Sequence, residues 1–124
     1  MSTLRVDNLQ ASDGLSPAFS TVGVAKGNWW YNQITPATNR SANVSSITDN
    51  STGNHTINWT NTFNAADVAV TTSGGMDAAT ANLRVCTSKD DDGPSASTKV
   101  VETRNNAATV LDSYSHGAAY GDLA

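Results

Sequence analysis

The sequence predicts an all-β protein, a small antiparallel β-sandwich with an extended N-terminal arm. Ser, Thr and Asn make up about a third of the chain and form helices poorly, because their side chains compete for backbone hydrogen bonds. No stretch repeats its apolar residues with the period of a helix. Short segments with the two-residue period of a strand instead recur, with turn residues between them, which is typical of an antiparallel sandwich or small barrel.

We predict that residues 1–26 form the arm and residues 27–124 the sandwich domain. In the arm, Leu4 and Val6 alternate as in a short strand, and Leu9 adds a third apolar side chain before the turn residues that follow. So few apolar residues cannot form a core of their own. We therefore expect them to serve attachment or assembly, by docking on the same domain, on copies of the chain or on a partner.

The clearest local pattern is a β-hairpin over residues 43–60, in which the turn residues 49–54 separate two strand-like runs. In the second run His55, Ile57 and Trp59 share one face, and Asn and Thr residues occupy the other. We expect the first face to point into the protein and the second to remain in water.

Further strands are expected on both sides of this hairpin. Val68 and Val70 should face inward in one of them, and Ala81, Leu83 and Val85 should share one face of another. The expected strands are residues 28–32, 67–72, 81–88, 97–104 and 108–114, the separators are residues 73–75, 90–94 and 105–106, and one helical turn is expected at residues 76–81.

The charge balance argues against nucleic acid as a partner. The net charge is −4, and the 7 Lys and Arg residues are scattered, so no basic patch is available to neutralise phosphates. No run reaches the ~18 apolar residues that a membrane helix needs, and residues 1–20 lack the order of a signal peptide. We expect synthesis in a bacterial cytoplasm and no membrane partner.

Enzymatic activity is not expected. His55 shares a strand face with apolar residues, so a partly buried, hydrogen-bonded histidine is the favoured interpretation. His116 follows Asp112 and Ser115, but these residue types of a hydrolase triad lie within five positions, whereas triads are assembled from separate loops. A polysaccharide hydrolase needs two carboxylates in a cleft, and the single glutamate, Glu102, lies in the middle of a predicted strand.

No metal or other cofactor is expected either. Asp90, Asp91 and Asp92 are consecutive and precede Gly93, so their side chains point in different directions and favour a solvated turn over a calcium loop. The single cysteine, Cys86, has no Cys or His at ligand spacing. We expect it to be a reduced, packed thiol.

Trp29, Trp30 and Tyr31 form the most informative aromatic run. Because neighbouring strand residues point to opposite faces, at least one of the two tryptophans should leave the core of its own domain. An exposed aromatic side chain can be buried against another subunit, which is the favoured interpretation, or can stack on a sugar.

Several segments resemble bacteriophage tail-fibre and related virion proteins, in particular the short β-rich module at fibre ends in phages of aquatic bacteria. The start STLRVD at residues 2–7 matches the family pattern. So do NVSSITDN at residues 43–50, INW at residues 57–59 and NAADVA at residues 64–69. The resemblance is good over residues 28–72.

This resemblance implies a structural virion protein, a short homotrimeric tail fibre or fibre-like projection attached through its arm to other virion proteins. The alternatives are a decoration (cement) protein on the capsid surface and an adhesin that binds a host surface glycan. Family modules continue with another apolar strand after the segment corresponding to residues 108–114, whereas residues 115–124 are short and glycine-rich. We therefore expect an open sheet edge that a neighbouring subunit or virion protein covers.

Overall fold

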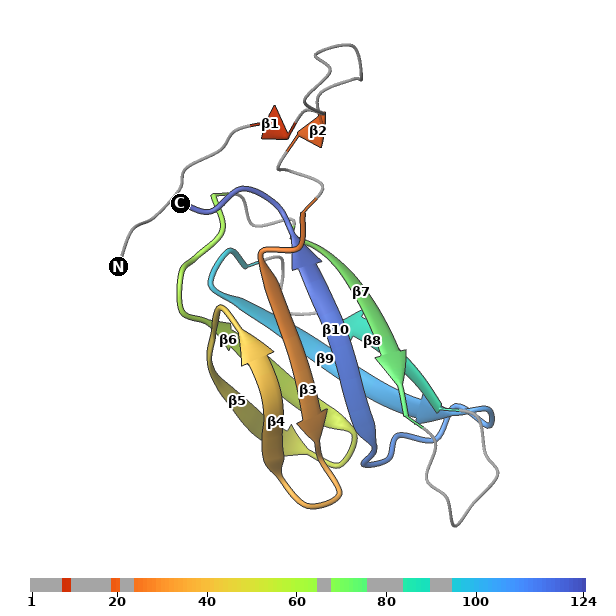
Figure 1. The fold of residues 1–124 in the computed structure, drawn as a ribbon. Helices are drawn as coiled ribbons and strands as arrows, with labels where there is room; N and C mark the ends of the chain where they lie inside the picture. Colours follow the sequence, from red (N-terminus) through yellow and green to blue (C-terminus); the bar gives the residue numbers. More distant parts are fainter. Residues whose placement is uncertain (1–7, 10–18, 21–23, 65–67, 76–83, 90–94) are drawn as a thin grey trace.

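The computed structural model describes residues 8–9, 19–20, 24–64, 68–75, 84–89 and 95–124, and these contain strands but no helix (Figure 1). The strands are β1 (Asn8–Leu9), β2 (Phe19–Ser20), β3 (Gly27–Asn32), β4 (Ala37–Ala42), β5 (Val44–Ser51), β6 (Asn54–Trp59), β7 (Ala69–Gly74), β8 (Arg84–Lys89), β9 (Thr98–Asn105) and β10 (Tyr114–Tyr120).

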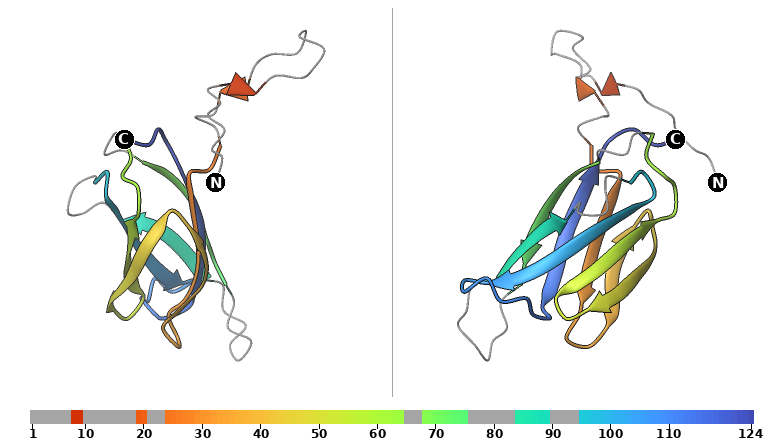
Figure 2. Two further views of the ribbon diagram at one scale, coloured as in Figure 1. Left: turned by 60° about the vertical axis from the view of Figure 1, so that its left-hand side comes forward. Right: turned by 180° about the vertical axis from the view of Figure 1, so that it is seen from behind.

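Two four-stranded sheets pack face to face, which confirms the predicted all-β sandwich. Their strand orders are β4-β3-β10-β7 and β5-β6-β9-β8, and every pairing is antiparallel. Figure 2 shows the two layers from the side and from behind. β1 and β2 pair with each other and lie beyond the end of the sandwich at which β3 begins (Figure 1).

A single residue carries the chain from β4 in one sheet to β5 in the other. Asn43 has a φ of 54°, a left-handed conformation that asparagine tolerates better than most residues. Its Oδ1 accepts a hydrogen bond from the backbone N–H of Asn61 at 2.7 Å, and its Nδ2 donates to the carbonyl oxygen of Asn61 at 3.1 Å. These bonds hold the corner between the two sheets.

The predicted hairpin is confirmed as β5 and β6. Its turn contains Gly53, with a φ of 65°, where a Cβ atom would lie 2.5 Å from Cγ1 of Val110. The backbone N–H of Gly53 also donates to Oδ1 of Asp112 at 2.7 Å. Conformation and close packing therefore both require glycine at this turn.

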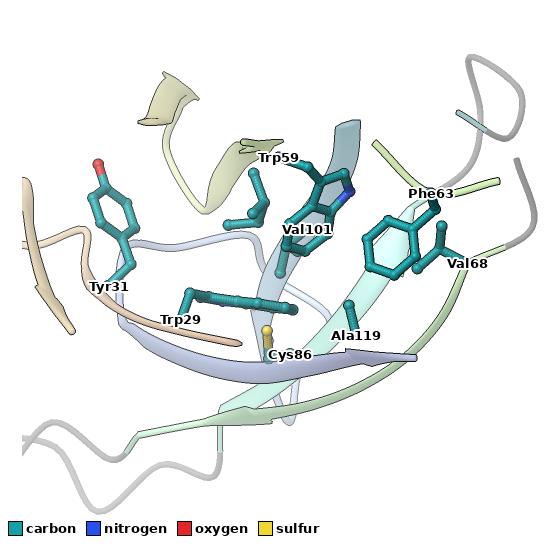
Figure 3. Packing of buried hydrophobic residues seen from close by; sticks show 9 residues of the cluster. Trp29, Tyr31, Trp59, Phe63, Val68, Cys86, Val101 and Ala119 are labelled. Atoms are coloured by element: carbon teal, nitrogen blue, oxygen red, sulfur yellow. The ribbon is translucent and has the colours of Figure 1, made fainter. Parts of the chain in front are cut away.

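The core lies between the sheets and contains the residues that strand alternation predicted. His55, Ile57 and Trp59 are all buried on β6, and Val68 is buried with Val70 packed against it. Figure 3 shows the buried apolar side chains, which are Trp29, Tyr31, Ile57, Trp59, Phe63, Val68, Cys86, Val101 and Ala119.

The predicted strand at residues 108–114 is wrong, and so is the expected open edge at the C-terminus. Ala108 has a φ of 59°, and Oδ1 of Asn105 accepts the backbone N–H groups of Ala107 and Thr109, so this segment forms a turn. The last strand is β10, which lies between β3 and β7 in the middle of its sheet. The inward-facing residues of β10 are small, which leaves room in the core for the large indole rings.

Other differences concern strands with weak apolar patterns. β4 was not expected, because all six of its residues are exposed and it is held at the sheet edge by backbone pairing with β3. Ser73 and Gly74, expected as separators, continue β7. On β8, Val85 is exposed and Cys86 faces inward. The helical turn expected at residues 76–81, together with Ala81, Leu83 and the acidic run at residues 90–92, lies outside the described residues.

Candidate functional site

The outer face of the β4-β3-β10-β7 sheet carries the candidate site. Register pairing aligns Arg40 on β4, Trp30 on β3, His116 on β10 and Ser73 on β7 in one row across the four strands. The side chains of Trp30 and His116 point away from the core, because they alternate with buried residues along β3 and β10, and the register places Arg40 and Ser73 beside them on the same face. Trp30 is 43% exposed in this row.

The structure separates the three aromatic residues predicted as interface or sugar-stacking residues. Trp29 and Tyr31 are each 3% exposed and belong to the core, whereas Trp30 leaves it. The prediction that at least one tryptophan points outward is confirmed. The candidate stacking residue is therefore Trp30, because the rings of Trp29 and Tyr31 are almost completely buried.

His116 holds the exposed indole from the neighbouring strand. The two rings meet edge to face, with centroids 5.5 Å apart and an interplanar angle of 78°. Such tilted arrangements are favoured between aromatic rings. The Nε2 atom of His116 is buried and has no hydrogen-bond partner within the described protein.

A hollow of about 350 Å³ lies on the same face over β7 and β10. Ala118 and Gly117 leave space on β10, and Thr71 and Ser73 on β7 supply hydroxyl groups from outward positions. The lining residues are Trp29, Thr71, Thr72, Ser73, His116, Gly117 and Ala118. The hollow therefore combines small residues, hydroxyl groups and one imidazole.

The charge on this sheet differs from that of the whole protein. The four strands, as described, contain no aspartate or glutamate, and Arg40 is their one lysine or arginine. The chain as a whole has 11 acidic residues and a net charge of −4. This face is therefore available to neutral or anionic ligands without repulsion from its own strands.

A serine and a histidine also meet inside the sandwich, sixty positions apart in the chain. Ser115 Oγ lies 2.8 Å from Nε2 of His55, and Nε1 of Trp29 donates to the same Oγ at 3.2 Å. Burial lowers the pKa of His55 to about 4, although Asp49 acts in the opposite direction. Both His55 and Ser115 have 0% exposure, so no substrate can reach this pair and it serves as a structural hydrogen bond.

The triad residues considered in the sequence do not assemble. Ser115 points into the core while His116 lies on the outer face, and Asp112 accepts the backbone N–H of Gly53. Adjacent strand positions cannot bring their side chains together on one face. The pairing of Ser115 with His55 was missed, because no local signal connects strands so distant in the chain.

The remaining candidate residues are placed as follows. Cys86 is free and buried, as expected, and burial raises the pKa of its thiol to about 11. Leu4 and Val6 lie outside the described residues, and Leu9 pairs in register with Phe19. Within the described segments, no three His, Cys, Asp or Glu side chains are grouped as metal ligands, and no helix is long and apolar enough to cross a membrane.

Comparison of the chain with known protein families, curated proteins and solved structures finds no match.

Proposed function

We propose that this chain is a structural protein of a bacteriophage particle, a short trimeric tail fibre or fibre-like projection attached through residues 1–26. The observation that carries the proposal is the division of the chain. The strands of the sandwich begin at Gly27 and pair among themselves, whereas β1 and β2 pair only with each other. The two described strands of the N-terminal segment therefore extend neither sheet, which supports a role for this segment in attachment or assembly.

The sandwich supports a structural role in two further ways. The segment that resembles virion proteins, residues 28–72, covers β3, β4, β5, β6 and most of β7, so the resemblance lies in the folded domain. The Ser115 and His55 pair is sealed in the core, and Glu102 is occupied by an ion pair with Arg104. These features favour assembly or binding over catalysis.

The test is the solution mass of the full chain and of a chain that begins at Gly27, measured by light scattering after size exclusion. We expect a trimer for the full chain and a folded monomer for the truncated chain. Monomers in both cases would contradict the trimeric fibre and favour a decoration subunit held by its neighbours on the particle.

Point variants sharpen the same test without removing any residue. Leu4→Asp combined with Val6→Asp should dissociate the trimer, because charged side chains cannot be buried at an apolar contact without a large cost. The matched control, Thr3→Asp combined with Asn8→Asp, adds the same charge at polar positions of the same segment and should leave the mass unchanged. Equal dissociation by both pairs would indicate simple charge repulsion.

A further inference from the structure

Trp30 is the most exposed large apolar side chain on the outer face of the β4-β3-β10-β7 sheet, which it shares with the partly exposed Tyr114 and Tyr120 of β10. The large apolar side chains with substantial exposure in the described residues are Val24, Trp30, Ile34, Val85 and Leu123. Trp30 alone among them lies on a strand of the β4-β3-β10-β7 sheet. The row next to it contains Ala42, Asn28, Ala118 and Thr71, in register across the same strands.

This pattern does not suit a protein interface. The centre of a subunit interface is broad and apolar, with several large side chains buried together. Here one strongly exposed indole is flanked by small, amide and hydroxyl side chains in the next row, and the other large rings on this face, Tyr114 and Tyr120, are only partly exposed and carry hydroxyl groups. A ligand with one small apolar face and many hydroxyl groups fits better, because the apolar face can stack on the ring while the hydroxyls meet polar neighbours.

The hollow supplies the polar neighbours beside His116. The Thr71 and Ser73 hydroxyls can each donate and accept hydrogen bonds, as sugar hydroxyls also do. Nε2 of His116 is buried and has no hydrogen-bond partner among the described residues, and the same side chain contacts Trp30. A volume of about 350 Å³ is at the lower end of the range for small-molecule sites.

The indole and the hollow are also fixed before a ligand arrives. Trp30, His116 and Ser73 lie on neighbouring strands in register, and β3 and β10 are the two central strands of their sheet. Ordering side chains on binding costs free energy. A site built on paired strands is already ordered, so its ligand should bind with a smaller cost of this kind. One cation, Arg40, is too little for a polyanion such as nucleic acid.

We propose that this face binds a saccharide, with a pyranose ring stacked on Trp30 and its hydroxyl groups directed to His116, Ser73 and Thr71 in the hollow. The site does not depend on the virion role, since it is built entirely within one sandwich.

The first test is fluorine NMR of the full chain labelled with 5-fluorotryptophan, which gives one resonance for each of the 3 tryptophans. The probes are the methyl glycosides of glucose, galactose, N-acetylglucosamine and glucuronic acid. We expect at least one glycoside to shift the Trp30 resonance, assigned with Trp30→Phe, and to leave those of Trp29 and Trp59 in place. No shift of Trp30 with any of the four would overturn the proposal.

The second test compares variants with whichever glycoside shifts Trp30. Trp30→Ala should weaken binding about tenfold or more, because the stacking surface is removed, and Ser73→Val should weaken it a few-fold. Val85→Ala is the matched control, because Val85 has the same 43% exposure as Trp30 but lies on a strand of the other sheet. It should bind as the native chain does, and equal weakening by Val85→Ala would overturn the site.

Two further readouts identify other occupants of this face. If Trp30→Ala lowers the solution mass while sugar binding was never detected, Trp30 contacts another subunit and the saccharide proposal fails. If Arg40→Ala weakens only the glucuronide, the site takes an acidic sugar, and an unchanged affinity assigns the ligand to neutral sugars.

Discussion

The two ends of the sandwich interior are held together in different ways. At one end Trp59, Phe63, Val68 and Ala119 form an apolar cluster, in which the Phe63 and Trp59 rings meet edge to face at 5.4 Å (Figure 3). At the other end, where Tyr31 lies in Figure 3, buried polar side chains replace apolar ones. Apolar burial stabilises without specifying direction, whereas buried hydrogen bonds specify which strand positions face each other.

The polar end connects the two sheets through side chains that have few alternatives. Nε2 of Gln33, after β3, donates to Oδ1 of Asp49 at 3.1 Å and to the carbonyl oxygens of Ser51 at 3.0 Å and Asn54 at 3.3 Å. Within one sheet, Ser113 Oγ donates to the carbonyl oxygen of Gly75 at 2.9 Å and joins the start of β10 to the end of β7. Removing the Gln33 side chain would take the donor away from all three acceptors at once, which is costly for groups that are shielded from water.

Trp29 belongs to both ends. Its ring packs against Trp59, with centroids 6.2 Å apart, while its N–H donates to Ser115 at the polar end. The absence of a side chain at Gly117 makes room for the indole, since a Cβ there would lie 2.2 Å from two of its ring atoms. A substitution that displaces the Trp29 ring should therefore disturb both ends of the interior.

The largest effect is expected for Gly117→Ala. The added methyl group overlaps a rigid ring that cannot move without disturbing both ends. We therefore expect the free energy of unfolding to fall by about 5 kcal/mol or more, which is enough to leave much of the chain unfolded. Urea denaturation followed by circular dichroism measures the loss. The double variant Gly117→Ala, Trp29→Phe should be more stable than Gly117→Ala alone, because the smaller ring relieves the overlap, and a simple sum of the two losses would contradict this explanation.

Phe63→Ala tests the apolar end alone. Phe63 is 2% exposed, and removing its ring should cost about 3–5 kcal/mol through lost burial and the cavity that remains. Its bridge partner Leu123 is 40% exposed, so Leu123→Ala is the control and should change stability little. Equal losses in the two variants, measured by the same denaturation experiment, would place the stabilising contact at the surface instead.

The polar end predicts a pH dependence. The pKa of His55 is about 4 in the folded chain and 6.5 without burial, so between these values the unfolded chain binds more protons than the folded one. Stability present above pH 6.5 should therefore fall as the pH drops toward 4, by at most about 3 kcal/mol. NMR titration of the folded chain measures the pKa of His55 directly. A value near its ordinary pKa would refute this explanation of the pH dependence.

Local patterns predicted a substantial part of the fold. The β5–β6 hairpin, the inward face of β6 and the opposite directions of Trp29 and Trp30 all follow from turn residues and the two-residue strand period. These features depend on neighbours in the chain, which is why they are visible without a structure. β4 and β10 were missed, because an exposed edge strand and a strand rich in small residues carry weak apolar patterns.

The sequence by itself determined the all-β class, the hairpin and the presence of one outward tryptophan, because strand alternation is a local property. Only the tertiary structure decided that β10 lies between β3 and β7, that His55 meets Ser115, and that Trp30, His116 and Ser73 form one row beside a hollow. These contacts join segments far apart in the chain, and their register depends on packing between whole sheets, to which local residue preferences contribute little.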